Sequence, residues 1–237
     1  MKLNDNIELL HGDCLELMKE LYDNDIIVDA IITDPPYNIS RDNNFKTMKR
    51  NGINFGEWDK GFNMTSWIYD ASLLLKKGGN IVIFCDWKSI TPIVEELESQ
   101  NFDVKDLIRW KKTNPMPRNR DRRFITDYEV AILAVKNGDK WIFNRLNDAY
   151  EIPEIVGGIT PKSEKFNGGH PTQKPIYVME WLLKRLTNEN DVVLDCFMGS
   201  GSTGVATINT NRKFIGIEKD DKYFEIARNR IEEHLNK

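Results

Sequence analysis

The tetrapeptide Asp34-Pro35-Pro36-Tyr37, which combines a carboxylate, two prolines and an aromatic ring, directly follows a run of apolar residues. Proline fixes φ and has no backbone N–H, so the carbonyls of this segment can face a ligand instead of continuing a strand ladder. Asp34 adds a carboxylate acceptor, and Tyr37 adds a flat ring. Acceptors beside such a ring can hold the exocyclic amino group of an adenine or cytosine that has left its stack. An ordinary turn at the end of a strand uses the same residue types, and these four residues alone leave that alternative open.

A glycine-rich loop follows a second short apolar run at residues 192–195. Glycines at 199, 201 and 204 have the G-x-G-x-x-G spacing, which lets a backbone turn tightly, approach a ligand and pack a helix against a strand. Glu218 ends the next apolar run, roughly 20 residues beyond the loop, where an acid can bind the ribose hydroxyls of a nucleoside. The spacing predicts a site for an adenosine-containing cofactor. A dinucleotide site, or a packing loop with a helix-capping acid, are the alternatives.

Alternating strand and helix patterns must position these two motifs. The run at residues 26–33 is short and rich in β-branched residues, which is typical of a strand buried on both faces of a parallel sheet. Further strands are expected at 80–85, 104–110, 128–135, 192–195 and 213–217, and helices at 65–75, 90–100 and 175–186, with Gly78-Gly79 ending the first helix. Residues 144–169 show little periodicity and are expected to be irregular. The pattern predicts a single α/β domain over residues 1–237, with a doubly wound, mostly parallel sheet whose carboxyl edge holds cofactor and substrate.

Taken together, the motifs resemble those of the DNA amino-methyltransferases that use S-adenosyl-L-methionine. The order of D-P-P-Y before F-x-G-S-G is that of the beta group, in which the motifs of a Rossmann-like methyltransferase fold are circularly permuted. Asp34 to Tyr37 match the catalytic motif, and the cofactor loop is matched by Asp195, Phe197, Gly199, Ser200 and Gly201. The hexapeptide His170-Pro171-Thr172-Gln173-Lys174-Pro175 matches a third motif, which in the family lies beside the methionine end of the cofactor. Residues 54–59 and 113–118 look like segments of small bacterial adenine methyltransferases of restriction-modification systems.

The resemblance implies a sequence-specific DNA adenine-N6 methyltransferase, which transfers a methyl group from S-adenosyl-L-methionine to a flipped adenine. The implied catalytic residues are Asp34, Pro35, Pro36 and Tyr37, with an ionised Asp34 and the Pro35 carbonyl accepting the two amino hydrogens. The implied cofactor-binding residues are Asp13, Cys14, Asp34, Lys174, Asp195, Phe197, Gly199, Ser200, Gly201 and Glu218.

Several of these cofactor residues have more than one candidate role. Glu218 is expected to accept from both ribose hydroxyls. Asp195 orders the loop or meets the methionine amino group. Asp13 meets the cofactor's adenine or, almost as readily, caps the helix that follows it. Lys174 is a cofactor contact or a surface residue.

Other activities stay open beside adenine methylation. Cytosine-N4 enzymes are the nearest alternative, although they more often carry Ser where this chain has Asp34. Protein or RNA amide methyltransferases usually have Asn there. A catalytically silent DNA-binding subunit would keep the same fold, but the intact Asp34, Tyr37 and Glu218 argue against it. A nicotinamide oxidoreductase would leave the D-P-P-Y segment unexplained, and no Pro-Cys pair is present for methylation of a ring carbon.

The net charge of −4 argues weakly against a nucleic-acid partner, but positive charge is concentrated locally. Residues 105–123 contain eight basic and two acidic side chains. Candidate DNA-recognition segments are 113–125 and 144–169, the candidate lid is 40–56, and the candidate DNA-binding residues are Arg118, Arg120, Arg122 and Arg123. A solvated charge run is the alternative. Double-stranded DNA is the expected partner, with a homodimer and a companion restriction endonuclease as further candidates.

Composition limits the remaining options. No apolar stretch is long enough to span a membrane and no signal peptide is evident, so a soluble, cytoplasmic protein without a membrane partner is expected. The three cysteines form no Cys-x-x-Cys pair, which predicts neither a disulfide framework nor structural zinc. The three histidines are scattered, and no metal site is expected.

Overall fold

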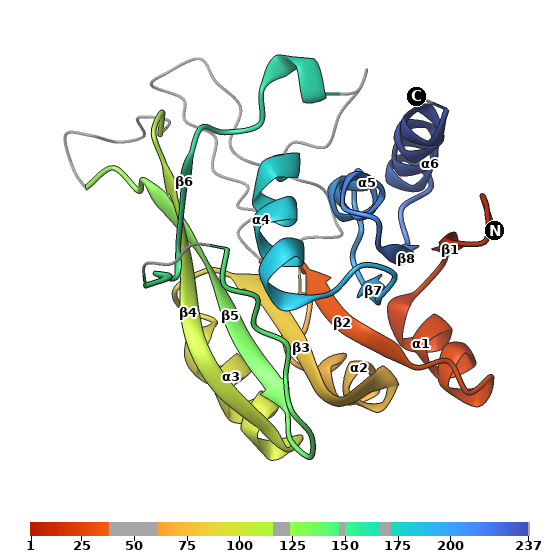
Figure 1. Ribbon diagram of the computed structural model, residues 1–237, viewed down its shortest axis with the longest axis horizontal. Coiled ribbons are helices and arrows are strands. Elements are labelled where there is room, and N and C mark those ends of the chain that lie inside the picture. The colour runs from red at the N-terminus through yellow and green to blue at the C-terminus, as the bar shows by residue number, and fades with distance from the viewer. Residues whose placement is uncertain (38–60, 116–123, 147–149, 166–171, 237) are drawn as a thin grey trace.

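The computed structural model describes residues 1–37, 61–115, 124–146, 150–165 and 172–236, which form one sheet with helices on both faces (Figure 1). Several predicted features lie outside these residues: the candidate lid 40–56, the motif-like segment 54–59, and the first two residues of the third motif, 170 and 171. The four candidate DNA-binding arginines, Arg118, Arg120, Arg122 and Arg123, also lie outside them.

In the described part of the chain, eight strands form a single sheet in the order β1-β8-β7-β2-β3-β5-β4-β6. Their bounds are β1 Ile7–His11, β2 Val28–Thr33, β3 Leu75–Cys85, β4 Phe102–Lys112, β5 Tyr128–Lys136, β6 Glu154–Gly157, β7 Val192–Asp195 and β8 Lys213–Glu218. Within this sheet β5 is antiparallel to both its neighbours, and the other paired strands are parallel. The expected doubly wound, mostly parallel α/β sheet is confirmed.

The described helices form two groups that cover the two faces of the sheet (Figure 1). One group is α1 (Cys14–Asp23), α2 (Ile68–Leu74) and α3 (Ile90–Ser99), and the other is α4 (Ile176–Leu186), α5 (Ser202–Asn209) and α6 (Asp221–Leu235). Buried side chains such as Met18 on α1 and Leu182 on α4 pack against the central strands. No described helix is both long and apolar enough to span a membrane.

Two sequence expectations about local structure are wrong. The pair Gly78-Gly79 does not end a helix, because α2 ends at Leu74 and β3 already runs through both glycines. Gly78 has φ +73°, and a Cβ there would lie 2.4 Å from the Lys140 carbonyl oxygen, so the glycine permits a close chain crossing inside an irregular part of the strand. The segment 144–169, expected to be irregular, contains β6 at the sheet edge and a short 3₁₀ helix, Lys162–Glu164.

The sheet topology brings the chemical residues to one edge. Strands β1, β8, β7 and β2 are neighbours and parallel, so the segments after them open at the same side. Asp13 follows β1, Asp34 follows β2, and the glycine loop follows Asp195 at the end of β7. Glu218 is the last residue of β8. Because β5 runs in the opposite direction, the start of that strand, with Glu129, reaches this edge as well.

Candidate active site

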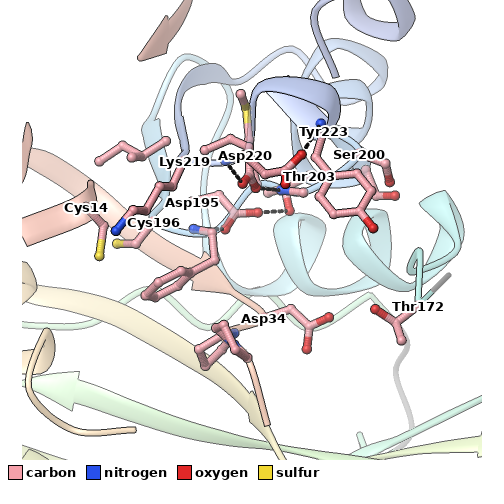
Figure 2. A pocket seen from close by; sticks show the side chains of 18 of the residues that line it. Cys14, Asp34, Thr172, Asp195, Cys196, Ser200, Thr203, Lys219, Asp220 and Tyr223 are labelled. Atoms are coloured by element: carbon pink, nitrogen blue, oxygen red, sulfur yellow. Dashed lines mark hydrogen bonds between the residues drawn. The ribbon is translucent and has the colours of Figure 1, made fainter. Parts of the chain in front are cut away.

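A cavity of about 630 Å³ lies at the carboxyl edge of the sheet. Its walls come from the segments after β1, β2, β7 and β8, from the start of β5 and from residues 172–174. Figure 2 shows Asp34 on one side of the cavity, with Lys219, Asp220 and Tyr223 on the other. The lining includes the predicted residues Asp13, Cys14, Asp34, Pro35, Pro36, Tyr37, Lys174, Asp195, Phe197, Gly199, Ser200 and Glu218.

Asp34 is held by hydrogen bonds at both carboxylate oxygens. Oδ1 accepts from the Tyr37 hydroxyl at 2.5 Å, and Oδ2 accepts from Lys174 Nζ. Burial raises the pKa of Asp34 above its usual range, the Lys174 cation opposes that shift, and the charge of Glu129 adds to it. Tyr37 therefore orients the carboxylate as well as offering its ring to the cavity.

Lys174 is buried, with a side chain only 5% exposed, so its interpretation as a surface residue is wrong. Its ammonium lies 4.9 Å from the ring centroid of Phe84 and 5.4 Å from that of Tyr37. Burial would lower the pKa of Lys174, but Asp34 and Glu129 raise it overall, and the group stays a cation. The closest partners of this lysine are thus side chains of the catalytic segment and of β5.

Asp195 joins the cofactor loop to the neighbouring strand β2. Oδ1 accepts from the Thr33 hydroxyl at 2.7 Å and from the Phe197 backbone N–H at 3.1 Å, and Oδ2 accepts from the Thr203 hydroxyl at 2.6 Å. Burial raises the pKa of Asp195 to about 6. These contacts support the loop-ordering role, one of the two predicted for this acid.

Glu218 joins the same loop to the segment after β8. One carboxylate oxygen accepts from the Gly199 backbone N–H at 2.9 Å, and the other accepts from that of Asp220 at 2.8 Å. Burial raises the pKa of Glu218 to about 7. Glu218 thus lines the cavity between the glycine loop and the segment after β8. A carboxylate in such a place can accept hydrogen bonds from the paired hydroxyls of a ribose.

Asp13 and Cys14 lie at the start of α1 beside Lys219. The Asp13 carboxylate accepts from the Leu15 backbone N–H at 3.0 Å as the helix N-cap, and from Lys219 Nζ at 3.0 Å. The capping alternative is therefore confirmed, and the side chain lines the cavity as well. Burial, with the adjacent Asp13 charge, raises the pKa of the Cys14 thiol to about 12, so it stays protonated.

Gly201 differs from the other loop residues, because it is not part of the cavity lining. It is the N-cap of α5 with φ +76°, and a Cβ there would lie 3.0 Å from Ile231 Cδ1 and 3.2 Å from Ala227 Cβ. Its place is between α5 and α6, where it permits helix packing. Ser200 does line the cavity, and its carbonyl accepts from Arg230 Nη1 at 3.0 Å.

Glu129 and Tyr223 are among the lining residues that were not predicted from the sequence. Glu129 Oε1 accepts from Lys112 Nζ at 2.5 Å, and Oε2 lies 3.1 Å from Lys174 Nζ. Lys174 and Lys112 lower the pKa of Glu129 and outweigh the effect of burial, which raises it. A lone acid at the start of an apolar strand was the available signal for Glu129.

The lining fits the adenosyl cofactor implied by the resemblance. The cavity volume is within the range of roughly 300–1,000 Å³ typical of ligand sites. The rings of Phe197 and Tyr223 offer apolar faces, and Glu218 offers a carboxylate. Gln173 Oε1 is buried and, among the described residues, has no hydrogen-bond partner. No group of three or more potential metal ligands is found in the described part of the chain.

Comparisons with known proteins agree with this geometry. A family model described as DNA methylase, N6_N4_Mtase, matches residues 28–229. The type II methyltransferase M2.LlaDCHI of Lactococcus lactis subsp. cremoris is 35% identical in an alignment 248 positions long, which spans 96% of this chain and 90% of that protein. The type II methyltransferase M2.MboI of Moraxella bovis is 33% identical in an alignment 252 positions long, which spans 96% of this chain and 88% of that protein. The crystal structure of an M1.HpyAVI–SAM complex has a TM-score of 0.78 and 42% identity, covering 94% of this chain and 99% of that one.

Proposed function

Because this chain belongs to the DNA methylase family, we propose that it methylates the N6 amine of adenine in double-stranded DNA at a specific sequence. Its methyl donor is S-adenosyl-L-methionine. The observation that carries the proposal is the oriented Asp34 carboxylate beside the Tyr37 ring at the cavity. Asp at this position favours adenine, and cytosine-N4 methylation is the second candidate.

The catalytic segment acts on the target amine in two ways. The ionised Asp34 and the Pro35 carbonyl accept the two amino hydrogens, which frees the nitrogen lone pair and stabilises the positive charge that develops there. Extrusion of the base costs a few kcal/mol, and stacking on Tyr37 returns about 1–3 kcal/mol. The bound cofactor supplies an electrophilic methyl group, and correct positioning of the amine can lower the barrier by about 7–11 kcal/mol.

The proposed cofactor contacts come from the neighbouring strand ends. Glu218 accepts from the ribose hydroxyls, and the backbone at Gly199 and Ser200 lies along the nucleoside and methionine portions. Asp195 holds that loop in place. Asp13, Cys14, Phe197 and Lys174 complete the binding site, and Gly201 supports it through the packing of α5.

The remaining assignments concern partners and organisation. Residues 1–237 are proposed to form one catalytic domain, with residues 40–56 as a lid and residues 113–125 and 144–169 as DNA-recognition segments. Relatives are named type II methyltransferases, which supports a role in a restriction-modification system. A companion endonuclease, a homodimer and a cytoplasmic location are further proposals.

Methylation of unmodified genomic DNA tests the proposal. The purified protein is incubated with S-adenosyl-L-methionine, and single-molecule sequencing then reports modified bases. N6-methyladenine confined to one short motif is the expected result.

Asp34→Ala should abolish methylation. Its cofactor affinity, measured by isothermal titration, should stay within about threefold of wild type, because a single contact is removed beside the methyl group. N4-methylcytosine would favour the second candidate. Cofactor binding without any modification would indicate a silent DNA-binding subunit.

A further inference from the structure

Glu129 is an acid at the cavity for which the proposed mechanism has no role. It lies at the start of β5, and its Oε2 forms an ion pair with Lys174 Nζ at 3.1 Å. Oε1 accepts a hydrogen bond from Lys112 Nζ at 2.5 Å. Oε2 is buried, and its contact with Lys174 is an ion pair at 3.1 Å without full hydrogen-bond geometry. Glu129 is thus a second anion already in contact with the lysine that binds the catalytic acid.

Lys174 lies between two carboxylates and can serve either one. An ammonium group has three donors, which rotate about a flexible stem. One of them reaches Asp34 Oδ2, while Nζ is 3.5 Å from the Tyr37 hydroxyl oxygen and 3.1 Å from Glu129 Oε2. A small rotation of the ammonium would therefore turn the ion pair with Glu129 into a hydrogen bond.

The proposed transfer creates a competition for Asp34. Both of its oxygens already accept hydrogen bonds, Oδ1 from Tyr37 and Oδ2 from Lys174. The Lys174 ammonium carries a full positive charge and the target amine does not, so Coulomb attraction gives Lys174 the advantage at Oδ2. A buried ammonium can leave one anion only if another is near, because an unpaired charge is costly in such a place.

We infer that Glu129 is a positioning residue that takes up the Lys174 ammonium when Asp34 binds the target amine. This role rests on the proposed function, because it belongs to the same methyl transfer. Lys112 stays on Oε1 of Glu129 throughout. Asp34, Glu129, Lys112 and Lys174 then keep two negative and two positive charges in either arrangement, so the exchange leaves no uncompensated charge.

The same geometry gives a pH signature. Titratable groups whose charge is coupled to that of Asp34 come from several elements: Tyr37, Cys85, Glu129, Lys174 and Asp195. Burial is the largest influence on the pKa of Asp34 and raises it, while the Lys174 cation lowers it. The negative charge of Glu129 raises this pKa further. Replacing Glu129 by a neutral residue should therefore let Asp34 ionise at a lower pH. The acidic limb of the methylation rate should move downward in pH even though the rate itself falls.

Single-turnover methylation of a DNA duplex carrying the target motif, with enzyme in excess and S-adenosyl-L-methionine saturating at every pH, tests this role. Glu129→Gln keeps the shape of the side chain and loses its charge, whereas Glu129→Asp keeps the charge and shortens the side chain. Glu129→Gln should slow methylation at least about tenfold, with cofactor affinity within about twofold of wild type, since no cofactor contact is assigned to Glu129. Glu129→Asp should retain more of the rate than Glu129→Gln.

A matched control is available at the amino end of β2, away from the cavity at the carboxyl ends of the strands. Asp29 on β2 also pairs with a lysine, Lys76, at 2.6 Å, and its side chain is 25% exposed against 27% for Glu129. Asp29→Asn should methylate at the wild-type rate with an unshifted acidic limb.

Three results would overturn the role of Glu129 while the wild-type enzyme is active: an unchanged rate in Glu129→Gln, an unmoved acidic limb, or a slower Glu129→Asp than Glu129→Gln. The last ranking would indicate that shape, and not charge, matters at this position. A wild-type protein that methylates no DNA would instead refute the proposed function, and the role of Glu129 with it.

Discussion

The affinity of this enzyme for S-adenosyl-L-methionine should fall about tenfold between pH 8 and pH 6, because Glu218 must be ionised to accept the ribose hydroxyls. Burial raises the pKa of Glu218 to about 7. An acid that binds only when ionised weakens the apparent affinity by the factor 1 + 10^(pKa − pH). This factor is about 1.1 at pH 8 and about 11 at pH 6, a difference of about 1.4 kcal/mol.

Isothermal titration at both pH values measures the change, with Glu218→Gln as the control. The variant should bind more weakly at pH 8 and should lose the dependence that belongs to Glu218. The amino group of the cofactor titrates near pH 8, and burial raises the pKa of Asp195 to about 6. Both effects are common to the wild type and the variant, so the ratio of their dissociation constants isolates Glu218. Parallel pH curves for the two proteins would refute the ribose assignment.

Two further predictions concern the loop and the DNA. Thr203→Val leaves Asp195 Oδ2 without its hydroxyl donor and should lower the free energy of unfolding by about 1–3 kcal/mol in urea. Thr207→Val on the same helix, whose hydroxyl only returns to the Gly204 carbonyl, should cost less than about 1 kcal/mol, and equal losses would contradict the special role of Asp195. Neutralising Arg120 and Arg122 to Gln should weaken binding to all DNA sequences and reduce the slope of log affinity against log salt by about 1 per lost phosphate contact. An unchanged slope would mean that these arginines are a solvated charge run.

The central part of the site could be predicted because its residues follow directly on buried parallel strands. Asp34 and the loop after Asp195 each come after an apolar run, and Glu218 ends another. Parallel strands open at the same edge, so their order along the chain was enough to bring these residues together. Glu129 could not be found in this way, because it lies at the beginning of its strand and not after its end. Only the reversed direction of β5 carries it to the cavity.

Other differences come from contacts between distant segments. The pair Gly78-Gly79 is as suitable for a helix end as for an irregular strand, and the approach of Lys140 decides between them. β6 has four residues and gains its place by pairing with β4, which no local pattern could indicate. The sequence around Lys174 is equally suited to a surface position, since the burial of this lysine depends on two acids far away in the sequence, Asp34 and Glu129.

Asp195 should affect the proposed reaction although it is assigned no contact with the target base. Its bond to Thr33 fixes the last residue of β2, directly before Asp34, and its bond to the Phe197 N–H fixes the start of the cofactor loop. One carboxylate thereby sets the distance between the segment that holds the amine and the segment proposed to hold the methyl donor. A misplacement of about 1 Å can slow such a transfer about a hundredfold. We therefore expect residues that join two strand ends to influence the rate together with those that contact the substrate.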